Sequence, residues 1–247
     1  MSPLPTAMDL TMAFAMVLGI GPALILMYLG VRNYTFPRVE QPFFSDPTFF
    51  MLFVAGMISG SAIFMAIAFF QAPSNIILMA LIAAISIMVM VVIMNLRRFR
   101  GKSDSVFYGY GLGLGSACGL ATGFCYLVYG NLMKAEAGLD LSVVSLVIIS
   151  VSMAMILGAC GTTVGEGIAR HRVMEFALQA LLPLVAYYML FAAAIGTGDS
   201  LLYYLYLTLM LVLGAVYYYY IMWRKLPSII REVLRMEGKK RDDIPRV

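Results

Sequence analysis

Residues 106–131 read VFYGYGLGLGSACGLATGFCYLVYGN, a run that contains no charged side chain. As a helix, this run is long enough to cross the roughly 30 Å hydrocarbon core of a membrane. Glycine recurs every four residues, and positions four apart share one helix face, so Gly111, Gly115, Gly119 and Gly123 form a stripe without side chains. A neighbouring helix can approach such a stripe closely. We therefore expect a membrane-spanning helix that packs tightly along its glycine face.

Six further apolar runs of similar length flank this one, at about 10–31, 48–70, 75–96, 141–165, 174–195 and 200–223. The whole chain has 62% hydrophobic residues, 12% charged residues and a mean hydropathy of +0.90. These values lie far from those of a soluble domain. The sequence predicts an all-α, polytopic membrane protein with seven transmembrane helices.

The basic residues lie in alternate gaps between the apolar runs. Of the 17 Lys and Arg residues, all but Lys134 follow the first, third or fifth run or lie in the carboxyl-terminal tail. The positive-inside rule then predicts an extracellular amino terminus and a cytoplasmic carboxyl terminus in the cell membrane. The net charge of +4 follows from this pattern. We expect a lipid bilayer as the partner of the basic side chains, and no nucleic acid.

We divide the chain into a seven-helix transmembrane domain, residues 1–223, and a basic cytoplasmic segment, residues 224–247. Within residues 226–236, apolar side chains recur at helical spacing. This pattern predicts a short interfacial helix lying on anionic lipid. The same pattern also suits a docking surface for a cytoplasmic partner.

The glycine stripe of residues 106–131 has two candidate packing partners. Run 48–70 offers Gly56 and Gly60, and run 141–165 offers Gly158, Gly161 and Gly165. Small residues on both sides of a helix contact allow the backbones to meet. The stripe could instead line a narrow path for lipid or peptide, although helix packing is the commoner use.

Residues able to perform acid–base chemistry are scarce in the apolar runs. Glu166, at the end of one run, lies near the single histidine, His171. They could form an acid–base or metal-binding pair, but we favour a solvated turn without catalytic duty. Gln179 is a further polar candidate, because Pro183 should kink its helix and free the Gln179 carbonyl. We expect no metal and no cofactor, since one histidine and three dispersed cysteines make a metal site improbable.

The segment Asp104-Ser-Val-Phe-Tyr-Gly-Tyr-Gly-Leu-Gly-Leu-Gly115 resembles the PrsW-type membrane peptidase family, in which a similar run opens a glycine-rich helix. Gly161-Thr-Thr-Val-Gly165 is similar to the glycine-spaced end of a later helix in that family. The resemblance covers residues 104–170 and implies a shared fold.

The same resemblance implies loss of the family's chemistry. That chemistry depends on a Glu-Glu pair in an earlier helix, a Glu-Asn pair in the glycine helix, and intramembrane histidines. Here the span 71–96 contains no Glu, and Leu120-Ala121 stands where Glu-Asn would lie. The resemblance thus implies a PrsW-like protein without its active site.

We therefore expect a non-catalytic membrane protein that acts as a scaffold, as an accessory subunit of a membrane-protein partner, or as a binder of hydrophobic segments. Two alternatives stay open. One is a transporter or channel for a small or lipophilic solute beside the glycine helix. The other is a membrane hydrolase that uses Glu166 and His171.

Overall fold

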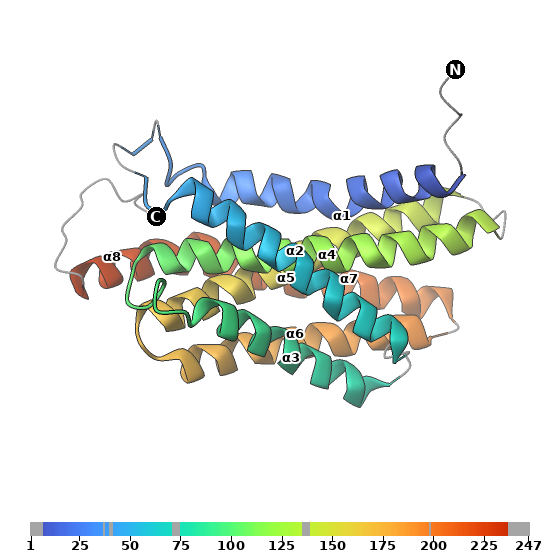
Figure 1. The fold of residues 1–247 in the computed structure, drawn as a ribbon. Coiled ribbons are helices and arrows are strands. Elements are labelled where there is room, and N and C mark those ends of the chain that lie inside the picture. The colour runs from blue at the N-terminus through green and yellow to red at the C-terminus, as the bar shows by residue number, and fades with distance from the viewer. Residues whose placement is uncertain are drawn as a thin grey trace, which may run out of the picture.

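The computed structural model describes residues 7–36, 38–39, 42–70, 75–134, 139–197 and 199–236, and these residues form a bundle of helices (Figure 1). A π-helical turn, Tyr220–Lys225, joins the last two α-helices. The helices are α1 (Ala7–Val31), α2 (Asp46–Phe69), α3 (Ile76–Met94), α4 (Asp104–Lys134), α5 (Leu139–Ala169), α6 (Val173–Gly196), α7 (Ser200–Tyr219) and α8 (Leu226–Met236). Seven of them are long and apolar enough to cross a membrane, which confirms the predicted fold class.

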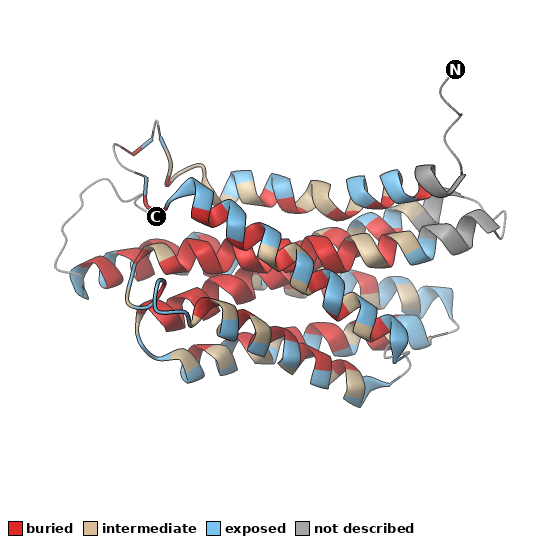
Figure 2. Cartoon of the chain, in the orientation of Figure 1, coloured by how far each residue is buried: buried red, intermediate tan, exposed pale blue. Residues whose placement is uncertain are grey.

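The two central helices are α4 and α5. Their spans are mostly buried, whereas less than half of each other span is buried (Figure 2). Helix α4 packs on α1, α2 and α5, while α6 and α7 pack on α5 and on each other. Helix α3 packs chiefly on α6 and less on α2, although only a short connection separates it from α2. The core thus surrounds the glycine helix.

The two ends of the bundle differ in the connections that they carry. At one end, which we call the basic end, lie the connections α1–α2, α3–α4 and α5–α6 together with α8 (Figure 1). At the other, the distal end, lie the last residues of α2, α4 and α6 and the first residues of α3, α5 and α7. Asn75 and Asp199 cap α3 and α7 there, because their side chains accept hydrogen bonds from Ile77 N and Leu201 N.

The carboxyl-terminal helix differs from our expectation in its surroundings. Helix α8 forms over the predicted residues 226–236, but its apolar stripe faces the protein rather than lipid: Leu226, Ile229, Ile230, Val233 and Leu234 are buried in the main core. Sequence periodicity identifies an apolar face but not what covers it. The basic tail beyond residue 236 lies outside the described residues.

No break separates α7 from α8, because the chain continues as one helical rod from Ser200 to Met236. Within the π-helical turn, the amide of Leu226 donates to the carbonyl of Ile221, five residues back. Pro227 follows directly and has no amide proton to donate to Trp223. The wider turn lets the helix accommodate this proline without ending.

Candidate functional site

The glycine stripe of α4 faces α2 along its length. A Cβ atom at Gly115 or Gly119 would collide with backbone atoms of α2, at Phe53 and Met57 respectively. In return, a Cβ at Gly60 of α2 would collide with the backbone of Ser116. Gly111 and Gly123, at the two ends of the stripe, lie against the rings of Phe49 and Phe64. The backbones of α2 and α4 therefore meet directly.

A second glycine face of α4 lies against α5. A Cβ at Gly109 would collide with the carbonyl of Gly161, and a Cβ at Gly161 with the carbonyl of Gly109. Gly165 lies in the same way against Ser105, at the start of α4. Both candidate partners of α4, the helices α2 and α5, make glycine contacts with it. Neighbouring helices thus cover both glycine faces of α4, where a path for lipid or peptide would have to lie.

Glu166 lies at the basic end and is buried, contrary to our expectation of a solvated turn. It is the one charged residue that is buried among the residues described. Its Oε1 lies 2.9 Å from Arg170 Nη2, and its Oε2 lies 3.8 Å from Lys225 Nζ. Arg170 Nη1 also lies 2.9 Å from Glu232 Oε1 in α8. The helix that carries Glu166 continues to Ala169, so no loop exposes the carboxylate.

This ion cluster, consisting of Glu166, Arg170, Lys225 and Glu232, connects α5 to the carboxyl-terminal helix. Phe176 of α6 completes it: Arg170 Cζ and Lys225 Nζ lie 5.6 Å and 5.7 Å from the centre of its ring. The two carboxylates and two cations balance in charge. Glu166 thus has two cations as near neighbours, and this pairing between helices favours a structural role.

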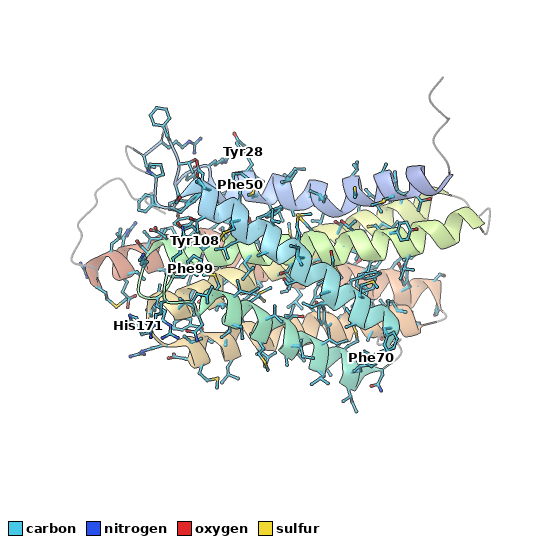
Figure 3. The ribbon with its side chains drawn as sticks, in the orientation of Figure 1. Tyr28, Phe50, Phe70, Phe99, Tyr108 and His171 are labelled. Carbon is cyan, nitrogen blue, oxygen red and sulfur yellow. The ribbon has the colours of Figure 1, made fainter. Side chains whose placement is uncertain are left out.

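His171 contacts different partners from Glu166. It is exposed, and its backbone adopts a left-handed conformation with φ of 57°. A Cβ at Gly101, the residue with φ of 68°, would lie 2.7 Å from His171 Nε2. Figure 3 shows His171 at the end of the bundle that also holds Phe99 and Tyr108. The histidine thus packs beside the α3–α4 connection, and its described contacts do not include the ion cluster.

Gln179, the third polar candidate, is exposed on α6. Helix α6 is continuous through Pro183. At the next residue after Gln179, the carbonyl of Ala180 accepts a hydrogen bond from the Cys160 thiol at 3.4 Å. In the part of the chain that the structure describes, no three His, Cys, Asp or Glu residues could together hold a metal ion.

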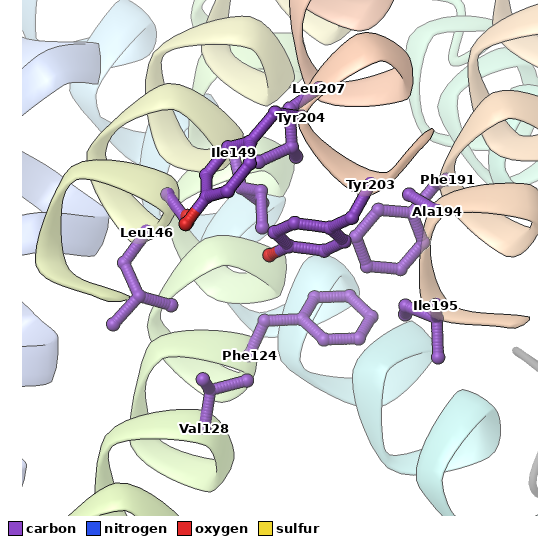
Figure 4. A pocket seen from close by; sticks show the side chains of 11 residues that line it. Phe124, Val128, Leu146, Ile149, Phe191, Ala194, Ile195, Tyr203, Tyr204 and Leu207 are labelled. Carbon is purple, nitrogen blue, oxygen red and sulfur yellow. The ribbon is translucent and has the colours of Figure 1, made fainter. Parts of the chain in front are cut away.

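A cavity of about 260 Å³ lies at the distal end, between α4, α5, α6 and α7 (Figure 4). Side chains from all four helices line it: Phe124, Val128, Ser145, Leu146, Ile149, Phe191, Ala194, Ile195, Tyr203, Tyr204 and Leu207. The rings of Phe124 and Phe191 meet edge to face at 4.8 Å, and those of Tyr203 and Tyr204 do so at 5.4 Å.

A groove of about 660 Å³ runs along the surface between α6 and α7. Its floor is formed by Leu190 and Leu213, which pack against the core. Its rims and remaining wall are Ala186, Met189, Leu209, Val212 and Val216. The groove is entirely apolar.

Neither the cavity nor the groove was predicted from the sequence. Nothing in the sequence shows that Tyr203 and Tyr204 line a cavity together with Ser145 and Phe124. Their grouping depends on which helices become neighbours. The spacing of Leu209, Val212, Leu213 and Val216 on one helix face was the one local signal for the groove.

Comparisons of the chain with protein-family models, with curated proteins and with solved structures found no match. The candidate sites are therefore interpreted from their own geometry.

Proposed function

We propose that this protein acts without catalysis, as a scaffold or accessory subunit that binds a membrane-spanning helix of a partner protein in the groove between α6 and α7. The observation that carries the proposal is the groove itself. It lies midway along both helices, where a bilayer would surround it. It has a floor and two rims, which is the shape that receives a helix.

Helix association in a bilayer depends on close packing, because lipid tails are as apolar as leucine. Ala186 lowers one wall of the groove, so that a partner backbone could approach closely. Met189 on the rim has a flexible, polarizable side chain that adapts to an irregular surface. On α7 the lining residues Leu209, Val212, Leu213 and Val216 form a continuous stripe, which offers about 10 Å of helix to a partner.

The charged groups support a role that is not catalytic. The buried carboxylate of Glu166 is already paired with two cations, and His171 packs elsewhere. Tight packing of α4 against α1, α2 and α5 weighs against a solute path beside it. We retain as part of the proposal a cell-membrane location with the basic end in the cytoplasm, a glycine-zipper core, and distant kinship with PrsW-type proteins.

The groove proposal is tested by co-purification in mild detergent, with a bulky residue placed in the groove. In Val212→Trp the indole would fill the space between the rims, and we expect a stoichiometric partner to be lost. Val17→Trp is the matched control, because Val17 is an exposed valine on α1, far from α6 and α7 in the helix order. That variant should retain the partner.

Two outcomes would contradict the proposal. The wild-type protein could purify alone at fixed mass in detergent and in nanodiscs. Alternatively, the two tryptophan variants could retain the partner equally.

A further inference from the structure

The cavity at the distal end has two levels that differ in polarity. Each of the four helices contributes a pair of lining residues that are four positions apart in the chain. One residue of the pair lies near the end of the bundle, and the other lies about 6 Å deeper along the helix. The level nearer the end holds Val128, Ser145, Ile195 and Tyr203. The deeper level holds Phe124, Ile149, Phe191 and Leu207.

Polar groups occur at one level only. Ser145, Tyr203 and Tyr204 supply the hydroxyls of the lining, and Ser145 lies within hydrogen-bonding reach of Tyr203. Figure 4 shows the hydroxyl oxygens of Tyr203 and Tyr204 directed toward the side where Leu146 lies. The deeper level consists of two rings and two aliphatic side chains, all buried. The cavity is therefore amphipathic along the helix axes.

The entrance lies at the hydroxyl level. Val128, Ile195 and Tyr204 are exposed, whereas Phe124, Phe191 and Leu207 at the floor are buried. A molecule entering here would place its apolar part on the floor and leave its polar part beside the hydroxyls. An apolar cavity of about 150 Å³ is large enough for benzene. The volume of about 260 Å³ here accepts a larger group, such as a ring system or the end of an alkyl chain.

The lining residues carry no charge. A ligand carboxylate or ammonium would lose water without gaining a counter-ion, which is unfavourable in an apolar site. Hydroxyls can both donate and accept, so they suit an alcohol, an ester or an amide.

From this geometry we propose that the distal cavity is a binding site for a small neutral amphiphile, whose apolar end lies on Phe124 and Phe191 and whose hydroxyl or carbonyl group contacts Ser145 and Tyr203. The site is separate from the groove between α6 and α7, and the two proposals stand or fall independently. The same chemistry is found in neutral lipids of the bilayer and in free lipophilic solutes.

The test is photolabelling of the purified full chain with a diazirine-bearing 1-octanol, followed by mapping of the labelled residues by mass spectrometry. We expect label on the cavity segments of α4 and α7, around residues 124–128 and 203–207. A diazirine-bearing octanoate should label these segments about tenfold less, because its carboxylate must be desolvated.

Ala194→Leu fills part of the cavity and should reduce labelling by the alcohol about tenfold. Ala193→Leu is the matched control, since it adds the same side chain to the neighbouring position, which does not line the cavity. It should label as the wild type does. Tyr203→Phe changes the lining by one oxygen atom and should reduce labelling by about fivefold, as expected for one lost hydrogen bond. This second variant keeps the test valid if Ala194→Leu fails to fold.

The source of the ligand follows from competition in nanodiscs. Loss of label on addition of diacylglycerol identifies a lipid, and loss on addition of unlabelled octanol alone identifies a free solute; either result supports a neutral amphiphile site. Equal labelling of lipid-facing residues on α1 and α3 would overturn the proposal. So would labelling that Ala194→Leu and Tyr203→Phe leave unchanged, or labelling by octanoate as strong as that by the alcohol.

Discussion

The hydroxyl of Ser150 in α5 lies 2.5 Å from the backbone carbonyl of Leu18 in α1, to which it donates a hydrogen bond. Pro22 stands four residues after Leu18 and has no amide proton to offer that carbonyl. Ser150 therefore satisfies the group that the proline leaves without a partner inside its own helix. The two residues are 132 positions apart in the sequence, so the hydrogen bond joins two helices that are distant along the chain.

Replacing Ser150 by alanine should destabilise the protein by about 1 kcal/mol, because the Leu18 carbonyl is then left unsatisfied. The free energy of unfolding can be measured by denaturant titration in detergent. In a Pro22→Ala background, the amide of residue 22 is free to bond Leu18, so Ser150→Ala should cost clearly less there. Equal costs in the two backgrounds would show that Ser150 does not compensate for the proline.

Adding a methyl group at Gly115 should destabilise the protein by about 1–3 kcal/mol, because α2 must move away from α4 to make room. Gly196→Ala is the matched control, since no heavy atom lies within 4 Å of the Cβ position there. Thermal unfolding of both variants measures the difference. The direct contact between α2 and α4 would be refuted by a Gly115→Ala protein as stable as Gly196→Ala.

Neutralising Glu166 should destabilise the attachment of α8, because Glu166→Gln leaves Arg170 and Lys225 without their buried counter-ion. Loss of one partner of a buried ion pair costs about 3 kcal/mol. Limited proteolysis near residue 236 should become faster in this variant. Glu175→Gln is the control, because Glu175 is exposed and lies 3.7 Å from an exposed Arg172. Unchanged proteolysis of Glu166→Gln would contradict a role in holding α8.

Burial raises the pKa of Tyr34, which lies between α1 and α2, to about 12, although the positive charge of Arg231 lowers it in part. The protonated phenol is thus favoured in the folded state. Its contribution to stability is complete below the unfolded pKa of 10 and is lost as the pH rises toward 12. Between pH 10 and pH 12, the free energy of unfolding should therefore fall less in Tyr34→Phe than in the wild type. Identical pH profiles of unfolding would argue against the shift.

The ring of Tyr34 packs between aromatic rings from two other parts of the chain. It lies 5.0 Å from the ring of Phe107 at the start of α4 and 5.7 Å from that of Phe43. Phe43, in the α1–α2 connection, also donates its amide to the Tyr34 carbonyl at 3.3 Å. Nothing in the sequence indicates that the aromatic residues of this connection pack against Phe107 of α4.

Several features were predictable because they depend on local pattern. The apolar runs predict the spanning helices, because a backbone surrounded by hydrocarbon must form its hydrogen bonds within its own segment. The spacing of Gly111, Gly115, Gly119 and Gly123 gave a close-packing face. For the candidate sites, the sequence identified Glu166, His171 and Gln179 as polar residues, and its local pattern favoured a solvated turn for Glu166 and His171. Glu166 proved buried, while His171 and Gln179 proved exposed.

What the amino-acid sequence determined by itself is the number and extent of the spanning helices, because each depends on apolar residues that are contiguous in the chain. What the tertiary structure alone decided is the set of neighbours of each helix. The pairing of Ser150 with Leu18, the ion cluster around Glu166, and the cavity that Phe124 and Tyr203 line all bring together residues from different helices. Such contacts follow from how seven similarly apolar surfaces pack together, and hydropathy is too uniform to distinguish one partner from another.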